Sequence, residues 1–137
     1  MEAKGVAAIV TGGASGLGEG AARALAAAGC KVAIFDLQEA RGREVAAELG
    51  GLFVRCDVSS AESAEAAFAA AREAHGPCGI AVNCAGIAPG SRILGKNGPM
   101  PLENFDKVIQ VNLVGSFNIM RLAAADMATR EANADGE

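Results

Sequence analysis

The chain has 137 residues, of which 51% are hydrophobic and 4% aromatic, and its net charge is −4 at pH 7. This length suffices for one domain with its own core, and an acidic balance without a basic block excludes a typical nucleic-acid-binding protein. No apolar run is expected to be long enough to span a membrane, and the few residues before the first strand leave no room for a cleaved signal.

Strands and helices are predicted to alternate along the chain. Apolar runs predict strands at 5–11, 31–35, 52–56 and 79–83, and amphipathic or alanine-rich segments predict helices at 16–28, 38–49 and 61–75. Ser59 or Ser60 is the expected N-cap of the third helix. A long loop at 84–100, a helix at 101–130 and a polar tail at 131–137 complete the chain.

Strict alternation of strands and helices predicts βαβ units with right-handed crossovers. The fold class is therefore expected to be α/β, with a doubly wound parallel sheet in the strand order 3-2-1-4. In such a sheet a ligand binds at the carboxyl ends of the strands, at the switch point between the first and fourth strands. Residues 1–137 are expected to form one domain of this kind.

A glycine-rich turn, Thr11 to Gly18, connects the first strand to the first helix. A helix N-terminus presents unpaired N–H groups and a partial positive charge, and glycines let a pyrophosphate approach the backbone. The turn therefore predicts a dinucleotide site, and a purely structural turn is the alternative. The candidate binding residues are Gly12, Ser15, Gly16, Leu17 and Gly18.

Asp36 ends the second strand, twenty residues beyond Gly16. A carboxylate there accepts hydrogen bonds from the ribose hydroxyls of adenosine and repels a 2′-phosphate, and Leu37 offers no positive charge, which favours NAD over NADP. The alternative role for Asp36 is N-cap of the following helix. Arg41 and Arg43 are expected on the solvated face of that helix.

The spacing Thr-Gly-x-x-x-Gly-x-Gly resembles that of the short-chain dehydrogenase/reductase family, and the resemblance covers essentially the whole chain. The segments 82–88 and 111–122 and the loop 91–101 most resemble the type-2 3-hydroxyacyl-CoA dehydrogenases, also described as 17β-hydroxysteroid dehydrogenases type 10. The resemblance implies a Rossmann fold and NAD-dependent oxidation of a secondary 3-hydroxyl group to a ketone. It implies an acyl-CoA or similar small-molecule substrate, with a steroid or another small alcohol as the alternative.

The resemblance also assigns roles to two segments that follow strands. Asp57 and Val58 would lie beside the adenine ring, although an Asp after a strand is also a common turn or cap residue. Residues that would pass close to the ribose and pyrophosphate are Asn83, Cys84, Ala85 and Gly86. A reactive Cys84 thiol is disfavoured, because the only histidine, His75, is expected at the distant end of a helix.

Asn112 matches the asparagine of the family's Asn-Ser-Tyr-Lys catalytic tetrad. The resemblance implies that it distorts its helix locally and that its main-chain carbonyl positions a water; a satisfied structural asparagine is the alternative. The chain contains no Tyr, and the pattern is expected to stop before the family's fifth strand. This chain alone is therefore expected to be inactive, and a non-catalytic NAD-binding fragment or interaction module is the alternative reading.

Two expectations concern partners and environment. The last helix is apolar almost all round, which predicts a homo-oligomer through residues 105–128, with burial under a later part of the chain as the alternative. Four cysteines without metal-ligand spacing predict reduced thiols, no metal site and a cytoplasmic protein; they are Cys30, Cys56, Cys78 and Cys84.

Overall fold

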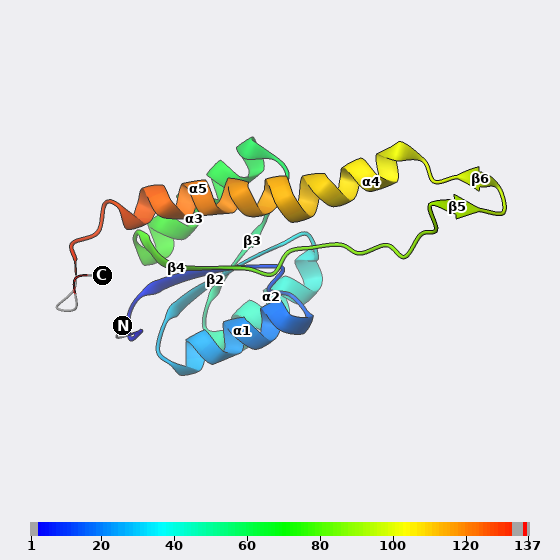
Figure 1. The fold of residues 1–137 in the computed structure, drawn as a ribbon. Coiled ribbons are helices and arrows are strands. Elements are labelled where there is room, and N and C mark those ends of the chain that lie inside the picture. Colours follow the sequence, from blue (N-terminus) through cyan, green and yellow to red (C-terminus); the bar gives the residue numbers. More distant parts are fainter. Residues whose placement is uncertain (1–2, 133–135, 137) are drawn as a thin grey trace.

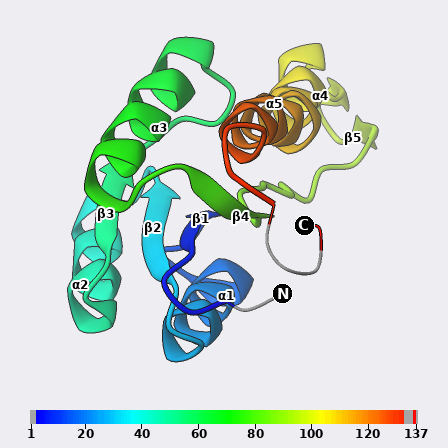
Figure 2. The ribbon, with the colours of Figure 1, turned by 90° about the vertical axis from the view of Figure 1, so that its left-hand side faces the viewer.

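The structure is a computed structural model that describes residues 3–132 and 136. Its main sheet has four parallel strands in the order β3-β2-β1-β4 (Figure 2), as the sequence predicts. The strands are β1 (Ala7–Thr11), β2 (Lys31–Asp36), β3 (Leu52–Arg55) and β4 (Cys78–Asn83). Each bound lies within two residues of the prediction. No further parallel strand pairs with β4 within the residues that the structure describes.

Helices cover both faces of the sheet, which confirms the doubly wound α/β architecture (Figure 1). One face carries α1 (Gly16–Ala27) and α2 (Glu39–Leu49), and the other carries α3 (Ala61–His75) and α5 (Ser116–Met127). The helix α3 has the predicted bounds, and its N-cap is Ser60, whose hydroxyl accepts a hydrogen bond from the Ser63 N–H at 3.2 Å. The connections between parallel strands place every strand's carboxyl end at the same edge.

Successive side chains along the strands point to opposite faces of the sheet and pack into two separate hydrophobic cores. Val10 and Ile34 pack with Val45 between the sheet and the α1–α2 layer, whereas Ile9 and Phe35 belong to the core beneath α3 and α5. This alternation follows from the period of two residues in a strand, and it makes both central strands apolar on both faces. The ring of Phe35 meets Phe68 edge-on at 5.6 Å in the second core.

The segment 84–100 differs from the long loop that the sequence predicts. It contains a short antiparallel hairpin, β5 (Leu94–Gly95) and β6 (Gly98–Pro99), which extends beyond the body of the molecule (Figure 1). The dipeptide Asn97-Gly98 is a turn signal that predicts such a hairpin.

The single helix expected at 101–130 is three consecutive helical segments. They are α4 (Leu102–Ile109), a π-helix η1 (Gln110–Gly115) and α5, which together form one long rod (Figure 1). A π-helical turn within a longer helix is rare and is found mostly at functional sites. The local distortion that the family resemblance implies around Asn112 is therefore present.

The rod Leu102–Met127 also corrects the expectation that no apolar run is long enough to span a membrane. It has 26 residues and a mean hydropathy of 1.3 in its most apolar window, which meets that criterion by length and composition. Core helices of water-soluble proteins meet the same criterion, and Ile119 and Ala123 of this rod lie in the core. Only 22% of the window is buried, so most of its surface is uncovered.

A buried carboxylate fixes α5 against the sheet. Asp126 is almost fully buried and accepts a hydrogen bond from the Cys78 N–H at 3.0 Å, at the start of β4. Its other oxygen pairs with Arg72 of α3. The carboxylate therefore joins two helices and a strand at the edge of the sheet where the strands begin.

Candidate functional site

A cavity of about 560 Å³ lies at the carboxyl ends of the parallel strands. It is formed by the segments that follow all four strands, together with two residues of the long helical rod. Its lining residues are Gly12, Ser15, Gly16, Leu17, Gly18, Phe35, Asp36, Leu37, Gln38, Cys56, Asp57, Val58, Cys84, Ala85, Gly86, Ile87, Lys107 and Val111. The structure thus brings together twelve of the thirteen candidate binding residues; Asn83 ends β4 but does not line the cavity.

The glycine turn is packed too closely to accept side chains at two positions. Gly12 has φ +64°, and a Cβ there would lie 2.8 Å from the backbone nitrogen of Ala85. A Cβ on Gly18 would lie 2.1 Å from the carbonyl oxygen of Gly12. The turn therefore packs directly against the first residues of α1. The N-terminal end of α1 lines the cavity.

The start of α1 presents N–H groups to this space. The first N–H to bond within the helix is that of Glu19, which donates to the Ser15 carbonyl at 3.1 Å. The preceding N–H groups, of Gly16, Leu17 and Gly18, lack partners within the helix because no earlier helical carbonyl exists. With the helix dipole, they make this end of the cavity suited to an anion.

Thr11 joins the glycine turn to the segment after β4, a role that the sequence analysis missed. Its buried hydroxyl oxygen accepts hydrogen bonds from the N–H groups of Cys84 and Ala85, both at 3.1 Å. The available signal was a hydroxyl-bearing residue at the end of a buried strand, where a side-chain acceptor can satisfy backbone donors.

Both oxygens of Asp36 are held by backbone N–H groups. One accepts from Ala14 in the glycine turn at 3.0 Å and the other from Gln38 at 2.9 Å, and the residue is 9% exposed. Asp36 is not the N-cap of α2, because that position is Gln38. The carboxylate is instead fixed in one orientation at the cavity wall, with Leu37 exposed beside it.

The segment between β3 and α3 lines the cavity through a local turn, and a side chain of α5 hydrogen-bonds to it. The Asp57 carboxylate accepts hydrogen bonds from the Ser59 N–H at 3.0 Å and hydroxyl at 2.6 Å, so its role as a turn residue is present. The side-chain amide of the buried Asn118 donates to the Val58 carbonyl at 2.9 Å. The Val58 side chain packs against Gly115, where a Cβ would lie 2.6 Å from it.

Asn112 lies beside the cavity but does not line it. Its side chain makes two hydrogen bonds to Ile87: the amide oxygen accepts from the N–H and the amide nitrogen donates to the carbonyl, both at 2.9 Å. The satisfied structural role is therefore present, and it holds the segment after β4 against η1. The Asn112 carbonyl accepts a hydrogen bond from the Ser116 hydroxyl at 2.7 Å.

The cysteines near the cavity lack the surroundings of reactive thiols. Burial raises the pKa of Cys56 to about 11, which keeps it protonated at neutral pH. Cys84 follows β4 and His75 precedes it, so the two lie at opposite ends of that strand. In residues 3–132 and 136 there is no cluster of three His, Cys, Asp or Glu side chains that could hold a metal ion.

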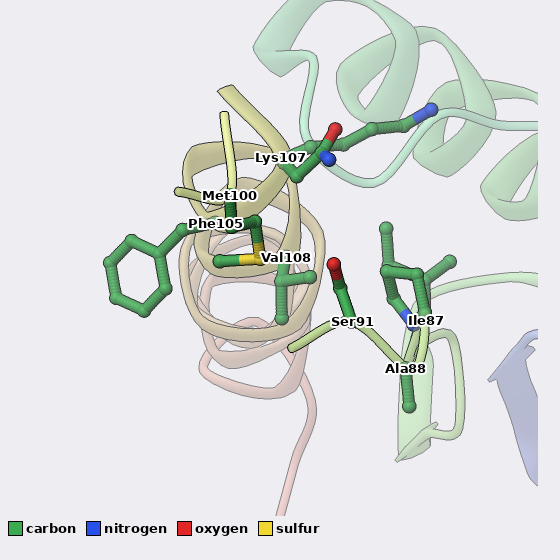
Figure 3. Close-up of a pocket in the computed structure, with 9 residues that line it drawn as sticks. Ile87, Ala88, Ser91, Met100, Phe105, Lys107 and Val108 are labelled. Carbon is green, nitrogen blue, oxygen red and sulfur yellow. The ribbon is translucent and has the colours of Figure 1, made fainter. Parts of the chain in front are cut away.

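A second cavity, of about 690 Å³, adjoins the first and shares Ile87 and Lys107 with it. Figure 3 shows it between the segment after β4, which contributes Ile87, Ala88 and Ser91, and α4, which contributes Val108. Its remaining lining residues are Pro89, Met100, Asn104 and Phe105.

Comparisons with known proteins agree with this geometry. Residues 6–135 match the family model described as short chain dehydrogenase. The chain is 43% identical to 3-hydroxyacyl-CoA dehydrogenase type-2 of Drosophila melanogaster, over 98% of this chain and 54% of that protein, and 42% identical to that of Bos taurus, over 98% and 53%. The crystal structure of 3-hydroxyacyl-CoA dehydrogenase type-2 from Mycobacterium avium superimposes with a TM-score of 0.87 at 40% identity, over 97% of this chain and 53% of that one. The chain therefore spans about half the length of the curated relatives it matches.

The close packing of the glycine turn predicts that Gly18 and Gly20, both on α1, respond differently to replacement by alanine. Gly18→Ala is expected to destabilise the protein by about 1–3 kcal/mol and to distort the turn, because its Cβ would overlap the Gly12 carbonyl. Gly20→Ala, where a Cβ meets nothing within 4 Å, is expected to stabilise it by about 0.5–1 kcal/mol. Urea unfolding followed by circular dichroism measures both; equal midpoints for the two variants would contradict the close contact.

Proposed function

Because the chain belongs to the short-chain dehydrogenase family, we propose that it forms the cofactor-binding half of an NAD-dependent oxidoreductase. The proposed reaction is oxidation of a secondary 3-hydroxyl group, on a 3-hydroxyacyl-CoA, to a ketone by hydride transfer. The observation that carries the proposal is that the glycine turn, Asp36, Val58 and the segment after β4 line one cavity. The acyl-CoA class is supported by the names of the relatives.

The residues of this cavity fit a dinucleotide. The close packing of Gly12 and Gly18 keeps side chains away from the open end of α1, where a pyrophosphate would receive backbone N–H groups. Asp36 would accept hydrogen bonds from the adenosine ribose, and Val58 would pack against the adenine. Bound NAD would supply the hydride acceptor, and this chain's residues would bind and orient it.

The fixed carboxylate supports NAD over NADP. Asp36 is held through both oxygens by Ala14 and Gln38, so it has little freedom to rotate away from a 2′-phosphate. The nearby Leu37 provides no compensating charge. A 2′-phosphate would therefore approach a fixed negative charge, whereas a 2′-hydroxyl would find a hydrogen-bond acceptor.

Replacing Asp36 tests the cofactor assignment. Asp36→Ala is expected to weaken NAD binding about tenfold, since hydrogen bonds to a charged acceptor are lost, and to narrow the preference for NAD over NADP. Isothermal titration calorimetry with each dinucleotide measures both constants. Asp106→Ala, an exposed aspartate of α4 outside both cavities, is the control and should change neither constant. An unchanged NAD-to-NADP ratio in Asp36→Ala would contradict the assignment.

The second cavity supports a neighbouring site for the substrate. It is continuous with the dinucleotide cavity at Ile87 and Lys107, so a molecule bound there would lie beside the proposed cofactor. Asn112 fixes this junction through its two bonds to Ile87. In the family's chemistry, a Tyr would exchange the proton of the substrate oxygen, and Lys and Ser would assist it.

The absence of any Tyr from these 137 residues favours a second candidate for the chain taken alone, a non-catalytic NAD-binding unit. The two candidates share the cofactor site and differ in turnover. If the chain is part of an active oxidoreductase, a steroid or another small alcohol is the alternative substrate, because most of the side chains that line the second cavity are apolar.

Turnover separates these candidates. The 137-residue chain is expected to bind NAD but to form no NADH from 3-hydroxybutyryl-CoA, as measured by absorbance at the NADH band. The full-length Drosophila relative serves as the positive control. A rate of about 1 s⁻¹ or more from this chain would show that the catalytic proton transfer does not need a Tyr.

We also propose that the uncovered side of the helical rod is a homo-oligomer interface. Large apolar side chains are exposed along it, and exposed apolar surface, where it is extensive, marks interaction sites. They are Leu102, Phe105, Leu113, Val114, Phe117, Met120 and Met127.

Sedimentation tests this interface. The protein is expected to sediment as a dimer or larger assembly and Phe117→Glu as a smaller species, because a buried charge without a partner is costly. Ile93→Glu, at an even more exposed apolar residue beside the β5–β6 hairpin, should leave the assembly intact. A wild-type monomer at high concentration would favour burial of the rod under the rest of a longer protein.

A further inference from the structure

An ion-pair network joins α1 to α2, whose N-terminal ends contribute residues to the lining of the proposed dinucleotide site. Glu19 follows Gly18 of the cavity lining, and Arg41 lies one helical turn after Gln38, which also lines the cavity. Both oxygens of the Glu19 carboxylate accept from one terminal nitrogen (Nη2) of Arg41, at 2.8 and 2.9 Å. The other terminal nitrogen (Nη1) of Arg41 pairs with Glu44 at 2.8 Å.

Arg41 and Arg43 both keep part of their side chains in solvent, as the sequence predicts, but they make different contacts. Arg43 is exposed, pairs with Glu39 at 2.8 Å and stacks on the Phe53 ring at 5.4 Å, toward β3. The side chain of Arg41 is 39% exposed, and its guanidinium connects α2 to Glu19 of α1. Among the described residues that line the cavity the one cation is Lys107, which comes from α4. Arg41 lies one helical turn after Gln38, the N-cap of α2, which lines the cavity.

Two carboxylates bind the terminal nitrogens of the Arg41 guanidinium. Bonds to Glu44 and Glu19 raise the pKa of its guanidinium, and bonds from Arg23 and Arg41 lower the pKa of the Glu19 carboxyl. Glu19 is the more enclosed partner, with a side chain 18% exposed against 61% for Glu44. An arginine near the ribose is what accommodates the 2′-phosphate of NADP in dinucleotide-binding folds.

We propose that Glu19 is a second determinant of cofactor choice: it holds Arg41 in an ion pair and so denies this cation to the 2′-phosphate of NADP. Asp36 repels the phosphate directly, and Glu19 removes the group that would offset that repulsion. The inference rests on the proposed function, because it concerns the same dinucleotide site. It assigns a binding consequence to a pair of side chains that do not themselves line the cavity.

The test uses Glu19→Gln in two backgrounds, the wild type and Asp36→Ala, with NAD and NADP titrated calorimetrically. In the Asp36→Ala background, Glu19→Gln is expected to tighten NADP binding about tenfold, as Arg41 gains a phosphate partner, and to change NAD binding by less than about threefold. The gain should shrink at high ionic strength, because it comes from a partly exposed charge pair. Adding Arg41→Gln should abolish it.

Glu48→Gln is the matched control. Glu48 also bridges the two helices, through Arg23 at 2.6 Å, but it does not contact Arg41. It should therefore leave both dinucleotide affinities unchanged, while thermal melting shows whether either substitution loosens the α1–α2 contact. A purely structural role for Glu19 would move NAD and NADP affinities together, and Arg41→Gln would not reverse the change.

These experiments distinguish failure of the role proposed for Glu19 from failure of the proposed dinucleotide-binding function. If Asp36→Ala narrows the NAD preference but Glu19→Gln does not tighten NADP, or the tightening survives Arg41→Gln, the role of Glu19 is overturned and the proposed function stands. If neither dinucleotide binds the wild type or any variant, both are overturned.

Discussion

The close approach of two backbone segments, the turn after β1 and the chain after β4, is the constraint on which the site depends. The Thr11 hydroxyl holds two N–H groups of the second segment, and Gly12 lies so near Ala85 that a side chain would not fit between them. These segments are 74 residues apart in the chain but form one continuous floor. Because buried N–H groups need partners, the hydroxyl and the absence of a Cβ are both required for this contact.

Three residues that line the rest of the cavity are each held by a contact outside it. Asp36 is tied to the glycine turn through Ala14, Val58 is held from behind by Asn118, and Ile87 is held by Asn112. Each wall is thus positioned by a side chain or backbone group of a different element. Such outer contacts keep a binding site in one geometry without touching the ligand.

The sequence carried enough information for the sheet and for most of the cavity. Apolar strands alternating with helices determine the strand order, and short polar or glycine-containing segments at strand ends must then meet at one edge. What it did not reveal depends on contacts between distant elements. The pairing of Arg41 with Glu19, on another helix, makes a residue of the solvated face part of an ion-pair network. The Thr11 bonds and the two bonds of Asn112 to Ile87 likewise depend on the approach of distant segments. The β5–β6 hairpin, by contrast, had an overlooked local signal, Asn97-Gly98.

The position of β1 in the sheet has a consequence for how the chain is made. It is made before β2 and β4, yet it is a central strand and pairs with both of them. One of its edges finds a partner soon, whereas the other waits for β4, and the bond between Thr11 and Cys84 spans 73 residues. During synthesis the nascent chain therefore carries an apolar strand with one open edge until β4 has been made. In that state a chaperone can bind the strand, and a second nascent chain can pair with it.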